Sequence, residues 1–132
     1  MNVLEVERLI YLQYNKKVEN GEKPYRLINT SGNSRKLFCD DIICISKIKG
    51  TKYVQYTTKE GECKEQVSLE QLEQELDRCE FVLVARGIIV NMCHVVRLQG
   101  NKIYLDNQMQ VEISRTKSVE VKEKIRRYWE RQ

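Results

Sequence analysis

The feature that most constrains the fold is the run of residues 81–91 (FVLVARGIIVN), in which apolar residues lie on both sides of Ala85-Arg86-Gly87. A buried run does not normally hold an arginine, because taking a charge out of water costs several kcal/mol unless the charge is paired. Arg86 is therefore expected either at a strand end, in solvent, or where it serves a function. Gly87 indicates a special backbone angle or a close approach by another group. The run predicts a strand, a polar interruption, and a second short strand or turn of helix.

Short segments of strand character, separated by turn residues, occupy much of the remaining chain. Lys49-Gly50-Thr51-Lys52 is a basic loop between two of them, and Gly100-Asn101 is a two-residue hairpin signal. Further strands are expected at residues 25–29, 36–38, 42–48, 53–58, 62–67, 95–98, 103–105 and 110–113. We therefore predict a mainly β fold with two or three helices, built from several small sheets.

Two helices are expected in the first half of the chain. Residues 1–17 have apolar positions spaced for one helical face, and residues 1–24 are predicted to form an N-terminal helix and linker before a domain at residues 25–132. A second helix begins at Ser68, which forms a capping-box pattern with Gln71. Its apolar face is expected to contain Leu69, Leu72, Leu76 and Cys79.

A last helix is expected to run from Ser114, as its capping residue, to about Trp129. Val121, Ile125 and Trp129 recur at four-residue intervals, so we expect them to seat this helix on the sheet. Its basic residues are interspersed with acids and are interpreted as a solvated face.

Composition limits the possible functions. The 132 residues are enough for one domain, and the net charge of +4 suits nucleic acid only if the positive charge gathers on one face. The chain has neither an apolar run long enough to span a bilayer nor a signal-peptide pattern, so a cytoplasmic protein is expected. The five cysteines are odd in number and widely spaced, which favours buried thiols over disulfides or a zinc site.

An enzymatic function finds little support in the sequence. His94 is the single histidine, so no histidine-based relay can be assembled, and we interpret it as a turn residue that bonds locally or to solvent. Asp40-Asp41 lacks nearby residues that would complete a metal site, and it is interpreted as a turn at the start of a strand. We therefore expect a protein that is not an enzyme and that has no cofactor, no metal and no small-molecule substrate.

Several segments in the same order resemble the LytTR family, the LytR/AgrA-type DNA-binding domain. That family carries a Phe-hydrophobic-Arg-hydrophobic-His-Arg-Ser segment leading into Ile-Val-Asn, and the matching residues are Phe81, Val82, Val84, Ile89, Val90 and Asn91. The other matching segments are Asp41-Ile42-Ile43-Cys44-Ile45, Tyr53-Val54, Ser68-Leu69 with Leu72 and Leu76, His94-Val95 and Ile113-Ser114-Arg115. The resemblance covers roughly residues 25–128 and implies an elongated, multi-sheet β fold of about ten short strands.

The resemblance also implies how DNA is bound. Domains of this family grip DNA with loops and strand ends that reach two successive major grooves. Arg86 and Arg115 match base-contacting positions, and an arginine can bond guanine O6 and N7 together. Lys49, Thr51 and Lys52 match a DNA-reaching loop, while Ser114 and the amides near it suit a phosphate. Each residue also has a structural alternative: the two arginines as solvated or locally paired charges, and the lysines as ordinary turn surface.

Two departures from the family pattern leave other functions open. Ala85 and Gly87 stand where the family motif has histidine and serine, which bears on base preference. Family members usually follow a phosphoacceptor receiver domain, and residues 1–24 are too short to be one. The expected function is sequence-specific binding of double-stranded DNA at direct repeats by a bacterial transcription regulator, with two copies forming a homodimer on DNA. The chain is expected to be either the output domain of a two-component response regulator or a stand-alone regulator. Its regulatory partner is expected to be a receiver domain, a histidine kinase system or a membrane-bound inhibitor.

The main alternative is a protein-interaction module that uses the N-terminal helix and binds DNA weakly. Clustering of Arg86, Arg115 and the lysine loop on one side would favour the DNA-binding function over this alternative. A third function, binding of single-stranded nucleic acid, needs exposed aromatic rings, and only Tyr53 and Tyr56 are placed for it.

Overall fold

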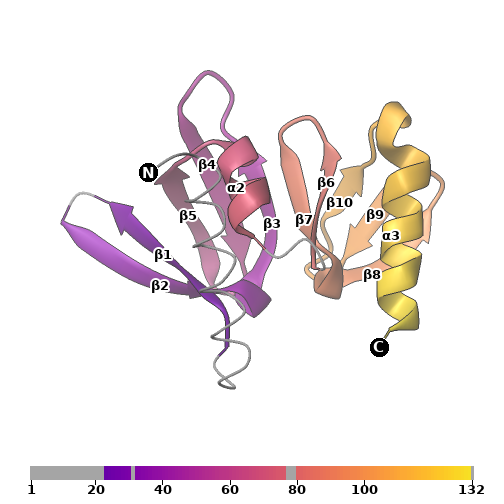
Figure 1. Cartoon of the computed structure of the whole chain (residues 1–132), viewed down its shortest axis with the longest axis horizontal. Coiled ribbons are helices and arrows are strands. Elements are labelled where there is room, and N and C mark those ends of the chain that lie inside the picture. The colour runs from indigo at the N-terminus through magenta and orange to yellow at the C-terminus, as the bar shows by residue number, and fades with distance from the viewer. Residues whose placement is uncertain (1–22, 31, 77–79, 132) are drawn as a thin grey trace. The chain divides into compact units, whose positions relative to one another are not determined.

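The computed structural model of the protein describes residues 23–30, 32–76 and 80–131. It divides into two compact units, residues 1–41 and 42–132, which are described separately below. Within the described residues the fold is mainly β, with ten strands in three antiparallel sheets and two α-helices, as the sequence predicts (Figure 1). The expected N-terminal helix of residues 1–17 lies outside the described residues. None of the described helices combines the length and the hydropathy that crossing a membrane requires.

The first unit contains one hairpin. Strands β1 (Tyr25–Thr30) and β2 (Asn33–Phe38) pair along their full length, and the hairpin is followed by a single 3₁₀ turn, η1 (Cys39–Asp41). The backbone N–H of Cys39 donates to the carbonyl of Pro24 at 3.0 Å, which closes the base of the hairpin. Asp40 and Asp41 therefore lie in a turn that leads into the next strand, as expected.

The second unit begins with a five-stranded sheet in the order β5-β4-β3-β7-β6. Its strands are β3 (Ile42–Lys47), β4 (Tyr53–Thr58), β5 (Gly61–Gln66), β6 (Phe81–Ala85) and β7 (Ile88–Asn91). The run at residues 81–91 is a hairpin, so the expectation of a strand, an interruption and a second strand is confirmed. β3 lies at the centre of the sheet and its first four residues are buried, in keeping with their apolar, β-branched character.

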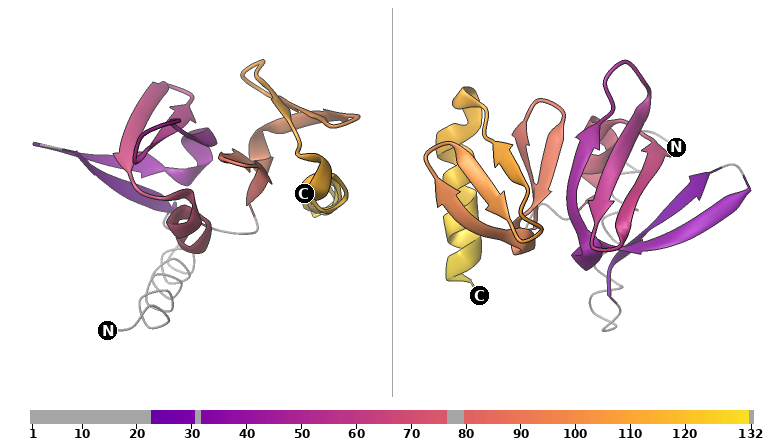
Figure 2. Two further views of the ribbon diagram at one scale, coloured as in Figure 1. Left: turned by 90° about the horizontal axis from the view of Figure 1, so that it is seen from above. Right: turned by 180° about the vertical axis from the view of Figure 1, so that it is seen from behind.

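A three-stranded sheet and the helices complete this unit. A 3₁₀ turn, η2 (Met92–His94), leads from β7 into β8 (Val95–Gln99), which pairs with β9 (Lys102–Leu105). The remaining elements are β10 (Gln110–Glu112), α2 (Leu69–Glu75), η3 (Arg115–Lys117) and α3 (Ser118–Glu130). Figure 2 shows α3 running alongside the three-stranded sheet in both of its views.

The capping box at α2 is half formed. Ser68 Oγ accepts a hydrogen bond from the backbone N–H of Gln71 at 3.1 Å, as the sequence predicts. The side chain of Gln71 does not reach back to the cap, because it donates to Glu75 at 2.7 Å instead. Leu72 and Leu76 are buried, which confirms the core-facing side of this segment, whereas Cys79 lies outside the described residues.

The last helix ends close to the predicted residue, at Glu130, but its start and one of its three expected core contacts differ from the prediction. Ser114 caps the 3₁₀ turn η3 without a side-chain hydrogen bond, and α3 begins only at Ser118, so the prediction that Ser114 caps this helix is wrong. Val121 and Ile125 are buried as expected, but Trp129 is 38% exposed and does not seat the helix. Tyr128 packs partly buried against the core in its place.

One hydrophobic core joins the two sheets and α3 of the second unit. It contains Ile43, Cys44, Val82, Val84, Val90, Met92, Val95, Ile103, Leu105, Val111, Ile113, Val121 and Ile125. The expectation of buried cysteines holds for Cys39 and Cys44, and burial raises the pKa of the Cys44 thiol. It is wrong for Cys93, which is exposed, and Cys63 is half-buried.

Candidate nucleic-acid interface

Three segments predicted to contact DNA come together at one end of the second unit. β3 pairs antiparallel with both β4 and β7, so the β3–β4 loop and the β6–β7 turn lie side by side, at the upper end of Figure 1. The backbone N–H of Lys47 donates to the carbonyl of Gly87 at 2.8 Å and joins these two turns. The N–H of Ser114 donates to the carbonyl of Val84 at 2.9 Å, which brings η3 to the same end. We call the loop 48–52, the turn 86–87 and the segment 114–117 the turn end.

The β6–β7 turn presents Arg86 to solvent. Gly87 has φ +82°, a left-handed conformation that the sequence indicates and that glycine adopts at little cost. A Cβ added at Gly87 would lie 3.6 Å from Lys47 Cβ, an ordinary contact, so the glycine is required by the backbone angle and not by lack of space. Arg86 is exposed, and no carboxylate of the described residues pairs with its guanidinium. The five N–H donors of this side chain are thus available to a ligand.

The loop between β3 and β4 is a tight turn held by Thr51. Its hydroxyl donates to the carbonyl of Ile48 at 2.8 Å and accepts from the backbone N–H of Tyr53 at 3.1 Å. The N–H of Thr51 also donates to Ile48 O, at 3.1 Å. Both donors of Thr51 are therefore used inside the loop, whereas Lys49 and Lys52 are exposed. Thr51 shapes the loop, and the two lysines carry its charge.

The segment before α3 presents Arg115. Arg115 is the first residue of η3 and is exposed, and within the described part of the chain its guanidinium has no acidic partner. The Ser114 hydroxyl lies 3.1 Å from the Thr116 hydroxyl, and either oxygen can be the donor. Ser114 is thus half-buried beside Arg115 with a hydroxyl close to the surface, although it does not cap α3.

An open depression lies between the loop 48–52, the turn 86–87 and the start of α2. The residues that line it include Lys47, Thr51, Lys52, Tyr53, Glu70, Glu73, Arg86 and Gly87. Lys47 was not singled out by the sequence as a contact residue. Only the pairing of the end of β3 with the start of β7 could have placed it beside Arg86. The two carboxylates on the opposite wall limit how strongly this depression attracts an anion.

The expected pair of aromatic rings for single-stranded nucleic acid is not present at this surface. Tyr53 is 42% exposed, but Tyr56 is fully buried in β4. Since stacking of successive bases needs several exposed rings, the placement of Tyr56 removes the basis of that alternative.

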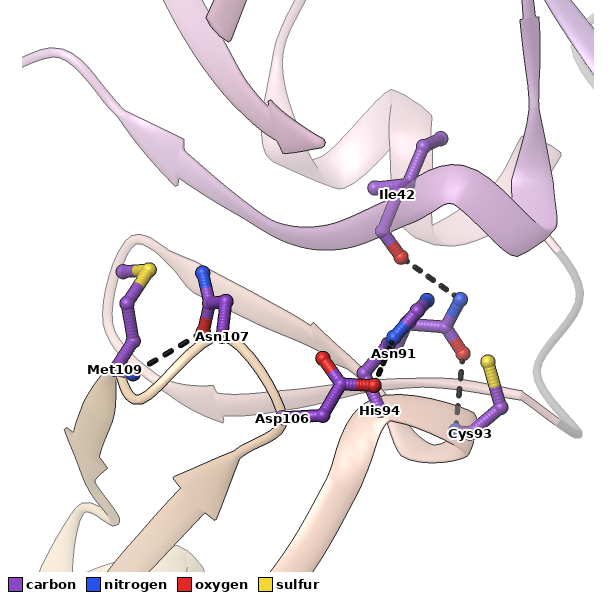
Figure 3. A network of polar contacts seen from close by, with 7 residues as sticks. All are labelled: Ile42, Asn91, Cys93, His94, Asp106, Asn107 and Met109. Carbon is purple, nitrogen blue, oxygen red and sulfur yellow. Dashed lines mark hydrogen bonds and ion pairs between the residues drawn. The ribbon is translucent and has the colours of Figure 1, made fainter. Parts of the chain in front are cut away.

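The other end of the same strands holds a second polar cluster, whose members bond to one another and to nearby backbone; Asn91 and His94 are buried, whereas Asp106 is exposed (Figure 3). Asn91 is fully buried; its Nδ2 donates to the carbonyl of Ile42 at 2.9 Å, and its Oδ1 accepts from the N–H of Cys93 at 3.2 Å. His94 is only 3% exposed, and its Nδ1 lies 2.7 Å from Oδ2 of Asp106. His94 lies in the turn η2, as expected, but its burial and its contact with Asp106, twelve residues away, show that the expected bonding to solvent or to a near neighbour in sequence does not describe this contact. We call Asn91, His94 and Asp106 the paired end.

Comparisons with known proteins agree with this fold. The family model of the LytTR DNA-binding domain matches residues 32–126. Among solved structures, the chain is similar to the LytTr DNA-binding domain of a putative methyl-accepting/DNA response regulator from Bacillus cereus, with a TM-score of 0.65 and 18% identity. That alignment covers 78% of this chain and 96% of the other. No curated protein matches the chain by sequence.

The three-sheet β fold and the match to the family model define a DNA-binding domain. Because the family model covers most of the chain, the protein belongs to the LytTR DNA-binding domain family. This is a family of DNA-binding domains and not a class of enzymes.

Proposed function

We propose that the protein binds double-stranded DNA in a sequence-specific manner, as the output domain of a bacterial transcription regulator. The observation that carries this proposal is the meeting of Arg86, Arg115 and the loop of Lys49 and Lys52 at one end of the second unit. These segments are far apart in the chain, and clustering of this kind is what the DNA-binding function requires. The family membership supports the same function.

Arg86 and Arg115 read base edges in the major groove. Each is exposed on a rigid segment, one in a two-residue hairpin turn and the other in a 3₁₀ turn hydrogen-bonded to β6. An arginine side chain at such a position can donate two hydrogen bonds to guanine. Neither guanidinium has an acidic partner among the described residues, so no ion pair with them has to be broken before DNA is bound.

Lys49, Lys52 and Ser114 contact phosphates, and Thr51 keeps the lysine loop in shape. Lysines on a tight turn give a sequence-independent attraction to the DNA backbone, which fixes the register for the arginines. Two copies of the protein bind adjacent direct repeats. Regulation comes from a receiver domain, a histidine kinase system or a membrane-bound inhibitor.

The test is fluorescence anisotropy of the chain with two duplexes of equal length, one holding a direct repeat selected from a random pool and the other a scrambled sequence. Wild type is compared with Arg86→Ala and Arg115→Ala. Arg126→Ala is the matched control, because this exposed arginine lies on α3 about two helical turns beyond its start.

We expect wild type to bind the selected duplex more tightly than the scrambled one. Arg86→Ala and Arg115→Ala should each lose about 1 to 3 kcal/mol of binding free energy on the selected duplex, so that the difference in affinity between the two duplexes becomes smaller. The Arg126→Ala control keeps the full preference. Equal, weak binding of both duplexes by wild type, unchanged in the variants, would contradict the proposal.

A further inference from the structure

In the β1–β2 hairpin, the part of β2 next to the turn is exposed to solvent, and none of the residues proposed above to contact DNA belongs to it. Every residue from Gly32 to Lys36 is exposed, although successive residues of a strand point to opposite faces. Neither face of β2 near the turn is therefore covered. Ile28, which pairs with Arg35 across the hairpin, and Leu37, farther from the turn, are 2% and 3% exposed. The ribbon formed by β1 and β2 is thus exposed along β2 from Gly32 to Lys36, with buried apolar side chains beside Arg35 on one of its faces.

The charge of this ribbon is entirely positive. Residues 25–38 contain Arg26, Arg35 and Lys36 and no acidic residue. Arg35 and Lys36 are both exposed and, as neighbours in β2, lie on opposite faces. The Lys36 ammonium lies 4.2 Å from the centroid of the Tyr25 ring and 5.6 Å from that of Phe38, which holds it over one face of the ribbon.

Neutral donors accompany the two cations. Ser34 Oγ donates to Asn29 Oδ1 at 2.8 Å across the strand pair. This bond fixes the Asn29 amide and leaves its NH₂ group as a donor on the same face as Lys36. Fixed cations and N–H donors without carboxylates suit a partner that is rich in acceptors and negative charge.

The DNA duplex is the partner that fits both the shape and the charge. Its major groove admits a two-stranded β-ribbon, and its phosphates line both sides of that groove. We propose that the β1–β2 hairpin is a second DNA-contacting element, in which Arg35 and Lys36 hold phosphates from the two faces of the ribbon. This inference rests on the proposed function only in taking duplex DNA as the ligand. It adds contacts that are independent of sequence.

A protein partner is the competing occupant, because Leu27 is 57% exposed on the face that carries Lys36. The charge favours DNA over this occupant. One exposed leucine among polar and basic residues gives an apolar area that is small for a hydrophobic protein contact. The absence of any carboxylate in residues 25–38 is what phosphate binding requires.

The experiment measures anisotropy of the double variant Arg35→Ala/Lys36→Ala against the selected and the scrambled duplex over a range of salt concentrations. The control is Arg126→Ala/Arg127→Ala, which removes the same two charges from the exposed surface of α3. Thermal unfolding checks that both variants fold. Hydroxyl-radical footprinting then compares the protected stretch of DNA for the two variants.

We expect the hairpin variant to bind both duplexes about tenfold more weakly, with a salt dependence shallower by about 1.8, since each lost phosphate contact removes about 0.9. Its footprint loses protected phosphates, and the control changes far less. Affinity and salt slope equal to those of the control would overturn the proposal and leave the ribbon to a protein partner. The proposal would also be overturned if the hairpin variant lost preference for the selected duplex while its salt dependence stayed unchanged. That result would mean that Arg35 and Lys36 contact bases and not phosphates.

The two proposals fail separately. If wild type shows no preference for the selected duplex, the proposed sequence-specific function fails. The affinities of the hairpin variant and of its control for the scrambled duplex would still test the role of the hairpin, because contacts to phosphates do not depend on sequence.

Discussion

The two ends of strands β3, β7 and β9 use polar residues in opposite ways. At the paired end, Asn91 and His94 are buried and bond to Ile42, Cys93 and Asp106 of the same chain. At the turn end, Arg86 and Arg115 are exposed and have no acidic partner within the described residues. Polar groups that are satisfied internally stabilise the fold, and those left unsatisfied at the surface are available to a ligand.

The buried, hydrogen-bonded residues of the paired end and the exposed arginines of the turn end should therefore respond differently to substitution. Removing a group of the paired end leaves buried partners without hydrogen bonds, so the cost appears in folding. Removing the side chain of Arg86 or Arg115 at the turn end leaves no partner of the described residues without a hydrogen bond, so the cost is expected in DNA binding alone. The following predictions test that separation.

The largest effect is expected for Asn91→Ala. This change removes a fully buried amide and leaves the Ile42 carbonyl and the Cys93 N–H without that partner, so it should lower the free energy of unfolding by about 2 to 4 kcal/mol. Urea denaturation followed by circular dichroism measures it. Asn107→Ala is the control, because the exposed Asn107 accepts one bond, from Met109 N–H at 3.1 Å, and its loss should cost under about 1 kcal/mol. If Asn91→Ala and Asn107→Ala lowered the free energy of unfolding equally, the buried hydrogen bonds of the paired end would not be what stabilises the fold.

A smaller loss is expected for Asp106→Ala. The buried His94 ring loses the carboxylate 2.7 Å from its Nδ1, and the free energy of unfolding should fall by about 1 to 2 kcal/mol. Asp106→Asn keeps an oxygen that can accept from Nδ1–H and should recover most of this loss in the same urea experiment. A similar loss in both variants would show that the contact itself is not what stabilises this end.

The two glycines of the turn end should separate base reading from backbone contact. Gly87 and Gly50 have φ +82° and +79°, so alanine at either position should lower the free energy of unfolding by about 1 kcal/mol. Gly87→Ala disturbs the turn of Arg86 and should narrow the preference for the selected duplex. Gly50→Ala disturbs the lysine loop and should weaken binding to all duplexes alike. Identical binding profiles for the two variants, measured by anisotropy, would count against the division of roles.

The smallest effect is expected for Lys49→Ala and Lys52→Ala. Each should lower affinity roughly threefold for any sequence, with a salt slope shallower by about 0.9, because one phosphate contact is lost. Neither change should alter the free energy of unfolding beyond about 0.5 kcal/mol. Lys64→Ala, an exposed lysine on β5, is the control and should leave the salt slope unchanged.

Hairpins were predictable from the sequence because their turns need particular residues. Gly50, Gly87 and Gly100 all have positive φ, and each marks a place where the chain reverses between apolar segments. The exposure of Arg86 follows from the same signal, since a two-residue turn puts its side chains in solvent. The meeting of Arg86 with Arg115 depends on the pairing of β6 with η3, which no local pattern contains.

In the last helix, the four-residue spacing of Val121, Ile125 and Trp129 did not place all three side chains on one face. Successive steps of four residues advance about 40° beyond a full turn, so Trp129 lies about 80° from Val121, whereas Tyr128 lies only about 20° away on the other side. Tyr128 consequently packs on the core and Trp129 is exposed. The contact between His94 and Asp106 was missed for another reason. It joins η2 to the β9–β10 turn, and its twelve-residue separation has no periodic signature.

The most direct test of the central claim is a titration of the ¹⁵N-labelled chain with the selected duplex, followed by amide chemical shifts. The account predicts that the amides of residues 48–52, 86–87 and 114–117 shift most, while those of residues 91–94 and 106–109 stay near their free positions. Shifts concentrated at the paired end, with the turn end unchanged, would contradict the assignment of the DNA-binding surface.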